Sequence, residues 1–328
     1  MNERTSTKGE EHEGRVALVT GAAGIVGPGI CSVLRREGWR VAASDRSEEH
    51  FRRYEKCVGE PVACEARFPA DLSAGRETCV RLVKKVREEL GEIALLVNGA
   101  VENVNSEPFE SVSEEVVERM TRLDLLAPLY LAQAAYPSLA KTHGSVVNIS
   151  SVMTRRMFAG NFLYATLKAG LEKMTEALAL ETAERGVRIN AIRLGAVPGW
   201  GYVRALAADL TADQAQRLYR DARERWRRER SGDPEAVPLH GVPEDVGEAV
   251  AFLASAKARY FHGAVVPLDG GWWFRIEPQL PQRVAARRES WREWVSDWFR
   301  REGLSPPAFP KGARAPAGQD SRDLRRGG

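Results

Sequence analysis

The segment Thr20-Gly21-Ala22-Ala23-Gly24-Ile25-Val26-Gly27 directly follows the apolar run Val16–Val19 and opens a stretch of helical period. Glycines at this point let the backbone turn tightly and approach a pyrophosphate, and the start of a helix offers free N–H groups to the same anion. A glycine-rich turn without a ligand is the alternative interpretation. The position between a strand and a helix favours a nucleotide site.

Asp45 ends the second apolar run, about 20 residues beyond the glycine segment. A carboxylate there accepts hydrogen bonds from the hydroxyls of an adenosine ribose and repels a 2′-phosphate. Arg46 supports NADP binding instead, because a guanidinium can bind the 2′-phosphate. A third interpretation is that Asp45 and Arg46 form an ion pair at the surface and bind no cofactor. We predict NAD rather than NADP as the cofactor.

Short apolar runs alternate with longer helical segments on the C-terminal side of this site, which is the pattern of repeated β-α-β units. Most of these runs are almost continuously apolar, as expected when both faces of a sheet are covered. The predicted fold is α/β, a Rossmann-like doubly wound parallel sheet of seven strands with helices on both faces, plus a C-terminal extension. The predicted strands are Val16–Val19, Arg40–Ala43, Ala63–Phe68, Ile93–Val97, Ser145–Ile149, Arg188–Ile192 and Ala264–Pro267.

We expect one catalytic domain over residues 15–273, preceded by a disordered tail over residues 1–14. Within the domain, residues 200–238 are Arg-rich, interrupt the alternation and predict a lid over the carboxyl edge of the sheet. Acidic residues are interleaved with those arginines, which favours a solvated helix over an anion-binding face. Residues 274–328 form the extension, with a short amphipathic helix containing Trp291, Trp294 and Trp298 and a disordered remainder.

The composition is typical of a folded globular protein, with 43% hydrophobic and 28% charged residues and no run long enough to span a membrane. The net charge is +3, but the segment after Trp273 holds 12 Lys and Arg against 7 Asp and Glu. The main body is therefore nearly neutral, and nucleic acid is not an expected partner. The four cysteines lack histidines at ligand spacing, so no metal site is expected. The polar N-terminus does not resemble a secretory signal, and we expect a cytoplasmic protein.

Tyr164 and Lys168 form a Y-x-x-x-K pair, and this spacing places both side chains on one face of a helix. Ser150 and Ser151 stand at the carboxyl end of the preceding predicted strand, where open α/β sheets bind ligands. A tyrosine exchanges protons readily near neutral pH only when a nearby cation favours the phenolate. Lys168 is that cation, so the pattern predicts a proton-transfer site.

Together these motifs resemble the short-chain dehydrogenase/reductase family, over most of the chain from about Arg15 to Trp273. The similarity implies an NAD(P)-dependent oxidoreductase that acts on CH–OH groups. It rests on TGAAGIVG at 20–27, Asp45, ADL at 70–72, LVN at 96–98, NISS at 148–151, YATLK at 164–168, RINAIRLGAV at 188–197, and the closing stretch from Pro238 to Asp269-Gly270-Gly271.

The resemblance implies that Tyr164 exchanges the proton of the substrate hydroxyl and that Ser151 binds the substrate oxygen. Lys168 favours the phenolate and holds the nicotinamide ribose. It also implies a homodimer or homotetramer formed through the helices around Pro128 and Tyr164. The cofactor-binding residues that it implies are Gly21, Gly24, Ile25, Gly27, Asp45, Asp71, Leu72, Asn98, Ala100, Tyr164, Lys168 and Val197.

Four positions depart from the family's commonest pattern. Ile25 replaces a glycine, although the three remaining glycines keep the spacing of the family's longer branch. Val101 cannot adopt the positive φ that glycine tolerates, so the local path is expected to differ. Asp124 stands where an asparagine helps to hold a proton-relay water, and we include it among the catalytic candidates because a second ionisable group can change the pH profile. Leu194 replaces a proline, which affects loop stiffness.

The expected function is the interconversion of a secondary alcohol and a ketone with NAD(H), with a small sugar-like or polyol alcohol as the substrate. One alternative is the reduction of a 3-oxoacyl thioester. Another is a dinucleotide-binding sensor or scaffold without turnover, which the presence of Tyr164 and its lysine makes the weaker hypothesis. An epimerase or dehydratase is disfavoured because the chain has no separate substrate domain.

Overall fold

The computed structural model describes residues 12–102, 108–157, 160–200, 203, 206–230, 240–271 and 280–309, without the side chains of 229–230 and 280–288. The chain divides into two compact units, Met1–Arg275 and Ile276–Gly328, and each is described by itself. Of the two expected tails, residues 1–11 and 310–328 lie outside the described residues. The same is true of residues 231–238 of the expected lid.

The first unit is built on a seven-stranded sheet in which every neighbouring pair is parallel, with the order β3-β2-β1-β4-β5-β6-β7. The predicted Rossmann-like sheet of seven parallel strands is therefore confirmed. The strands are β1 Val16–Thr20, β2 Arg40–Ser44, β3 Ala66–Arg67, β4 Ile93–Asn98, β5 Ser145–Ser151, β6 Arg188–Leu194 and β7 Val265–Leu268.

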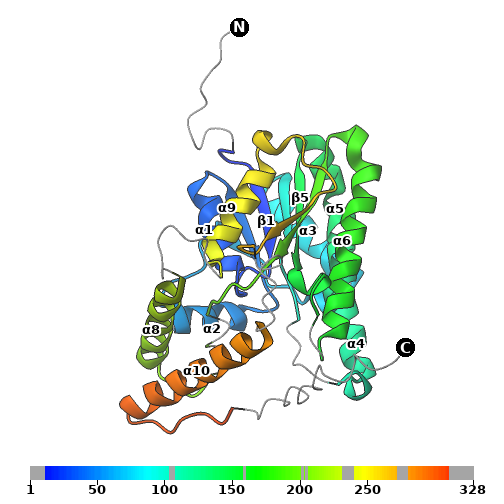
Figure 1. The fold of residues 1–328 in the computed structure, drawn as a ribbon. Helices are drawn as coiled ribbons and strands as arrows, with labels where there is room; N and C mark the ends of the chain where they lie inside the picture. Colours follow the sequence, from blue (N-terminus) through cyan, green and yellow to red (C-terminus); the bar gives the residue numbers. More distant parts are fainter. Residues whose placement is uncertain are drawn as a thin grey trace, which may run out of the picture. The chain divides into compact units, whose positions relative to one another are not determined.

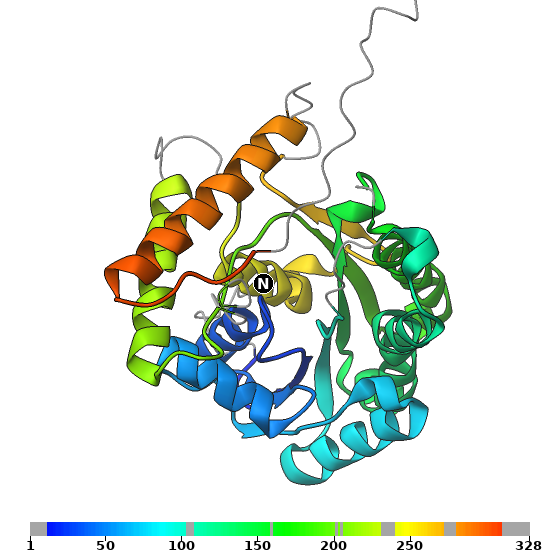
Figure 2. The same cartoon turned by 90° about the horizontal axis from the view of Figure 1, so that it is seen from below.

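Helices cover both faces of this sheet (Figures 1 and 2). Helices α1 and α9 pack together on one face, while α3, α5 and α6 lie on the other. The strands are accordingly apolar on both sides, and every residue of β1 and β4 is buried. The helices are α1 Gly27–Arg36, α2 Glu48–Val58, α3 Arg76–Leu90, α4 Glu114–Thr121, α5 Ala127–Thr142, α6 Phe162–Thr182, α8 Ala212–Arg230 and α9 Pro243–Ala254.

The third strand is shorter than the predicted range 63–68, because β3 contains only two residues. It lies at the sheet edge and pairs with β2 alone, so only one of its sides has a strand partner. Single hydrogen bonds from Glu65 N to Val41 O and from Phe68 N to Ala43 O extend this pairing beyond the strand. A further bond joins Ala70 N to Asp45 O at 2.8 Å. The chain that follows β3 is thereby kept beside the end of β2.

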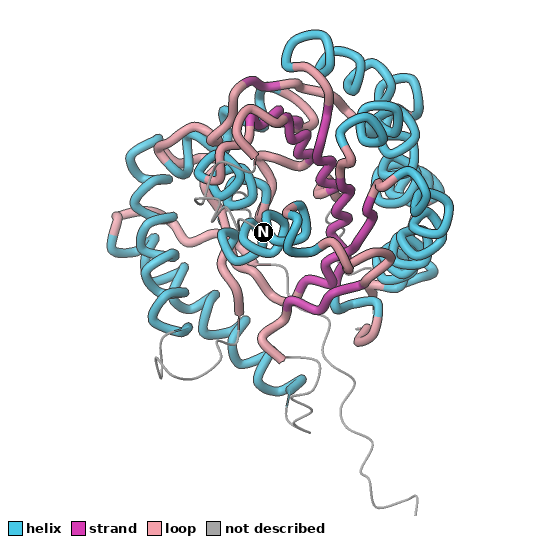
Figure 3. The backbone as a smooth tube through the Cα atoms, turned by 90° about the horizontal axis from the view of Figure 1, so that it is seen from above, coloured by secondary structure: helices cyan, strands magenta, loops and turns pink. Residues whose placement is uncertain are grey.

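The strand order creates a crevice at the carboxyl edge of the sheet. From β1 the chain proceeds outward to β2 and β3 and then returns to the other side of β1 as β4. The loops that leave β1 and β4 therefore lead to opposite sides, which is the position where open parallel sheets bind ligands. Figure 3 shows the helices arranged around the twisted strands of this sheet.

The second unit contains α10, Leu280–Arg301. This helix has 22 residues and is longer than the short amphipathic piece expected from the sequence. The rings of Trp291 and Trp294 stack with centroids 5.0 Å apart, and Trp298 meets Phe299 edge-on at 5.4 Å. In the described part of the chain, no helix combines the length and the apolar character needed to cross a bilayer.

Arg188 at the start of β6 closes the C-terminal end of α9. Its two terminal guanidinium nitrogens donate to the carbonyls of Leu253, Ala254, Ser255 and Ala258 at 2.6–3.2 Å. These carbonyls include orphan acceptors of the last helical turn, which otherwise need water or a capping group.

We expect Arg188→Met to lower the free energy of unfolding by about 2–4 kcal/mol, because it leaves partly buried carbonyls without their charged donor. Urea unfolding followed by circular dichroism measures the change. Arg185→Met removes an exposed arginine from the turn before β6 and serves as the matched control. Equal stability of both variants and the wild type would show that this cap is not needed.

Candidate active site

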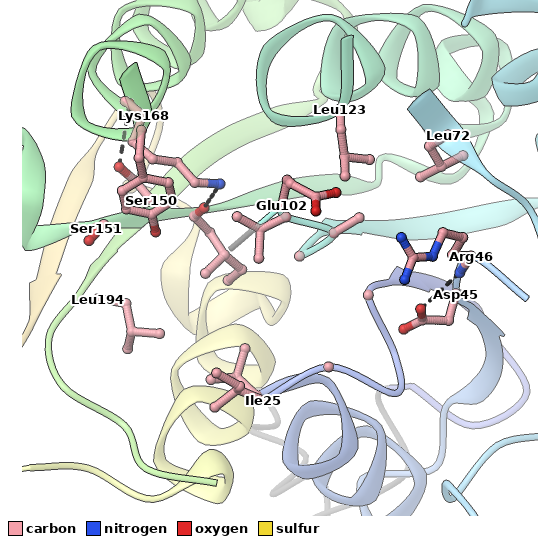
Figure 4. Close-up of a pocket in the computed structure, with 18 of the residues that line it drawn as sticks. Ile25, Asp45, Arg46, Leu72, Glu102, Leu123, Ser150, Ser151, Lys168 and Leu194 are labelled. Atoms are coloured by element: carbon pink, nitrogen blue, oxygen red, sulfur yellow. Dashed lines mark hydrogen bonds between the residues drawn. The ribbon is translucent and has the colours of Figure 1, made fainter. Parts of the chain in front are cut away.

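A cavity of about 460 Å³ lies at the carboxyl edge of the sheet, and most of the residues expected from the sequence line it (Figure 4). They come from the loops and helices that follow β1, β2, β3, β4, β5 and β6. The expected residues that line the cavity are Gly21, Gly24, Ile25, Asp45, Asp71, Leu72, Ala100, Ser151, Tyr164, Lys168 and Val197. Gly27, Asn98 and Asp124 are not among the lining residues.

The glycine segment after β1 forms a cradle that side chains would fill. Gly21 has a φ of +68°, and a Cβ there would lie 2.5 Å from the carbonyl oxygen of Gly99. A Cβ at Gly27 would lie 2.1 Å from the carbonyl oxygen of Gly21. The N–H of Ile25 has no acceptor among the described residues. A tight turn with an unused N–H at a helix start fits a pyrophosphate.

The Asp45 carboxylate sits at the end of β2 with only 7% of its side chain exposed. Oδ2 accepts the N–H of Ala23 in the glycine segment at 2.9 Å, and Oδ1 accepts the N–H of Arg46 at 2.8 Å. Oδ1 also contacts Nδ1 of His50 at the start of α2. The carboxylate is thus fixed beside the cavity by groups from three segments.

Helix α6 places Tyr164 and Lys168 on the cavity wall one turn apart. Lys168 is 3% exposed, its Nζ donates to the Ile149 carbonyl at 3.2 Å, and the same nitrogen lies 5.8 Å from the centre of the Tyr164 ring (Figure 4). Ser151 ends β5, and its Oγ accepts the N–H of Met153 at 3.2 Å. That bond does not use the hydroxyl proton of Ser151, which remains available for a substrate oxygen.

A buried ion pair that sequence reasoning missed supports this group of side chains. Arg193 at the end of β6 donates to both carboxylate oxygens of Glu172, at 2.9 and 2.6 Å. The hydroxyls of Ser150 and Thr154 also donate to Glu172, at 2.8 and 3.1 Å. Burial opposes ionisation of this carboxyl, but these donors lower the pKa of Glu172 below its usual range. One sequence signal could have identified Glu172. It follows Lys168 by four positions, as Lys168 follows Tyr164, so the three residues share one face of α6.

Asp124 lies behind Lys168 in a π-helical turn, Arg122–Leu126, between α4 and α5. Its side chain is fully buried, and Oδ1 lies 3.5 Å from the Lys168 ammonium. Burial raises the pKa of Asp124 to about 6, although Lys168 opposes this shift. Asp124 therefore contacts the lysine rather than the cavity.

Glu102 and Arg119 form a second ion pair on the cavity wall, with Arg119 Nη2 3.2 Å from Glu102 Oε1. Glu102 follows β4 and Arg119 lies on α4, and nothing in the sequence pattern indicated that these two residues meet. Asn98, which the sequence places beside the cofactor, is buried and does not line the cavity. Its amide donates to Asn148 Oδ1 at 2.7 Å, which ties the buried end of β4 to the middle of β5. Among the described residues there is no group of three His, Cys, Asp or Glu side chains that could hold a metal ion.

Comparison with known proteins gives a family match over most of the first unit. The family model described as Enoyl-(Acyl carrier protein) reductase matches residues 21–273. A 1,6-dihydroxycyclohexa-2,4-diene-1-carboxylate dehydrogenase from Pseudomonas putida is 32% identical over 261 residues, which cover 79% of this chain and 93% of that protein. The chain belongs to the short-chain dehydrogenase/reductase family.

Other members of the short-chain dehydrogenase/reductase family differ in what they act on. A 7alpha-hydroxysteroid dehydrogenase from Bacteroides fragilis is 27% identical, with 79% of this chain and 94% of that protein covered. A 3-oxoacyl-acyl-carrier-protein reductase from Rickettsia conorii is 29% identical, with 79% and 96% covered. A solved structure from Sinorhizobium meliloti, described as a short-chain alcohol dehydrogenase, has a TM-score of 0.63 and 28% identity. It covers 81% of this chain and 99% of that chain.

The protein is therefore an oxidoreductase that acts on CH–OH groups, and its family uses NAD(P) as cofactor. The expectation of an enzyme of this family is confirmed. The substrates of these relatives range from a cyclic diol to a steroid and an acyl thioester, so membership alone does not identify the substrate.

We expect Asp124→Asn to change how stability depends on pH. A carboxyl whose pKa is raised in the folded state binds its proton more tightly there, so its contribution to stability falls as pH rises through about 6. The unfolding free energy of the variant should gain on that of the wild type between about pH 4 and pH 6, by up to about 3 kcal/mol.

Urea unfolding at several pH values measures this difference. Glu88→Gln alters an exposed carboxylate of α3 and is the control, for which a nearly constant difference from the wild type is expected. A pH-independent difference for Asp124→Asn would contradict the raised pKa.

Proposed function

We propose that the protein is an NAD(H)-dependent oxidoreductase that interconverts a secondary alcohol and a ketone. The observation that carries this proposal is the convergence of Ser151, Tyr164 and Lys168 on the wall of one cavity that also includes the glycine cradle and Asp45. This arrangement supports a proton-transfer group beside a dinucleotide site.

In the direction of oxidation, the Tyr164 oxygen accepts the proton of the substrate hydroxyl, and Ser151 donates a hydrogen bond to the substrate oxygen. The buried Lys168 ammonium favours the phenolate and is itself held by the Ile149 carbonyl. A bound nicotinamide supplies the group that accepts or returns the hydride. In the direction of reduction, Tyr164 returns the proton to the carbonyl oxygen.

Asp45 supports NAD rather than NADP. Its buried carboxylate is fixed beside the cavity by the N–H of Ala23, the N–H of Arg46 and the ring of His50. A charge that cannot move away repels a 2′-phosphate and accepts hydrogen bonds from ribose hydroxyls. Arg46 also lines the cavity and is the group that would favour NADP if Asp45 were neutral.

We propose a small sugar-like or polyol alcohol as the substrate. The relative from Pseudomonas putida acts on a ring with two hydroxyl groups, which supports this class. The relative from Rickettsia conorii supports a 3-oxoacyl thioester as the alternative. Sugars, polyols, hydroxy acids and acyl thioesters tested with NAD or NADH, followed by NADH absorbance, distinguish the two classes.

We expect Tyr164→Phe to lower kcat by about 100- to 10,000-fold, because the ring remains but the proton donor is lost. NADH binding, measured by fluorescence titration, should change little. Tyr260→Phe removes the hydroxyl of a fully exposed tyrosine and should leave both quantities unchanged. Normal turnover by Tyr164→Phe would overturn the mechanism, and a wild type that binds NADH without turning over any alcohol or ketone would favour the sensor hypothesis.

We expect Asp45→Asn to shift the ratio of kcat/KM for NAD to kcat/KM for NADP by about 10- to 100-fold towards NADP, since the variant keeps a hydrogen-bond acceptor but loses the charge. Initial rates with each cofactor measure the shift. Glu49→Gln removes a nearby exposed charge from α2 and should leave the ratio unchanged. An unaltered ratio for Asp45→Asn would assign the preference to another residue.

A further inference from the structure

Trp200 joins the end of the β6 loop to the glycine segment. It follows the cavity-lining residues after β6, is 2% exposed, and begins the region predicted as the lid. Its indole N–H donates to the carbonyl oxygen of Gly24 at 2.7 Å, across 176 positions of sequence. A side chain from the segment after β6 thus makes a hydrogen bond to the loop that leaves β1.

The environment of Trp200 fixes the direction of this hydrogen bond. The ring lies against His50 and Tyr54 of α2, with centroid distances of 5.9 and 5.7 Å. The preceding residue, Gly199, lies directly on the glycine segment, since a Cβ there would be 3.0 Å from the Ile25 carbonyl oxygen. The buried ring is therefore packed between α2 and the glycine segment.

The hydrogen bond acts on one peptide plane. In a trans peptide, the carbonyl of Gly24 and the N–H of Ile25 point in opposite directions within one rigid plane. A donor on the carbonyl oxygen therefore also sets the direction of that N–H. The plane follows a glycine, which tolerates a wide range of φ and ψ, so it would rotate more easily without this restraint.

We propose that Trp200 is a positioning residue for the dinucleotide, which orients the Gly24–Ile25 peptide so that the N–H of Ile25 is presented to the pyrophosphate. The N–H of Ile25 has no acceptor among the described residues, and Ile25 lines the cavity. Donors that are oriented before the ligand arrives increase affinity, because the cost of ordering them is not incurred on binding. The proposal rests on the proposed dinucleotide site.

A purely structural role for Trp200 makes a different prediction. If the ring only fills space beside α2, an isostere of the same shape without the N–H would bind the dinucleotide normally. If the hydrogen bond orients the peptide, the isostere loses affinity although the packing is retained. The decisive comparison is therefore between the loss of the N–H and the loss of the ring volume.

The experiment measures binding of ADP-ribose, which carries the adenosine and the pyrophosphate, by titration calorimetry. Trp200 is replaced by 3-benzothienylalanine, in which sulfur replaces the indole N–H, and separately by phenylalanine (Trp200→Phe). We expect the isostere to raise the Kd about three- to tenfold, as one lost hydrogen bond predicts. We expect Trp200→Phe to raise it at least as much. Tyr54→Phe, which keeps its ring against Trp200, is the matched control and should leave the Kd unchanged.

An isostere that binds ADP-ribose as tightly as the wild type would overturn the proposal, whatever the result for Trp200→Phe. Because the isostere preserves the shape of the side chain, it should remain folded, which circular dichroism checks. An unchanged or lower Kd in the folded variant counts against the orienting role. Failure of the wild type to bind ADP-ribose at all would instead overturn the proposed dinucleotide site.

Discussion

The close approach of two backbone segments at the centre of the sheet is the constraint on which the site depends. The chain that leaves β1 at Gly21 and the chain that leaves β4 at Gly99 are so near that a Cβ on Gly21 would lie 2.5 Å from the Gly99 carbonyl oxygen. Thr20 fixes the two strand ends: its hydroxyl donates to Val97 O and accepts the N–H groups of Gly99 and Ala100 at 3.2–3.3 Å. The crevice of a doubly wound sheet opens above this contact, and the glycine segment can reach a ligand only because no side chain separates the strands there.

The side chains proposed to transfer the proton depend on a second restraint on the other side of the crevice. Glu172 is joined to Arg193 of β6, to Ser150 of β5 and to Thr154 in the turn that follows β5. Glu172 lies on α6, two turns beyond Tyr164, so one buried carboxylate connects the three segments that carry Ser151, Tyr164 and the loop to Val197. A buried charge is stable only when it is well paired, and the bidentate arginine supplies that pairing. The cost of burying the pair is offset by a fixed geometry at the site.

Local sequence patterns predict the fold and most of the residues that line the cavity. They do not predict the contacts that hold these residues in place. Continuous apolar runs predict the strands to within a few residues because burial on both faces leaves a strong signal. The predicted length of the edge strand β3 is too great, because the sequence does not reveal that this strand has a partner on one side only. The contacts of Glu172 with Arg193 and of Trp200 with Gly24 join residues 21 and 176 positions apart. Arginine and tryptophan have no local signature that reveals a distant partner, so only the folded chain brings these residues together.

The π-helical turn shows how one local irregularity changes the electrostatics of the site. A turn with i to i+5 hydrogen bonds inserts an extra residue into the helical path and rotates the helix beyond it. Here the turn lies between α4 and α5 and carries Asp124, whose Oδ1 comes within 3.5 Å of the Lys168 ammonium.

Lys168 is almost fully buried, and the Ile149 carbonyl alone offsets only part of the cost of its charge. When it is ionised, the Asp124 carboxylate attracts the ammonium, and its negative charge opposes the formation of a second negative charge at Tyr164. Because burial raises the pKa of Asp124 to about 6, this competition is weakest in mildly acidic solution and strongest above it. With a neutral side chain at the same position this competition would be absent at every pH, so Asp124 makes the electrostatic field at Tyr164, the proposed proton-transfer group, depend on pH.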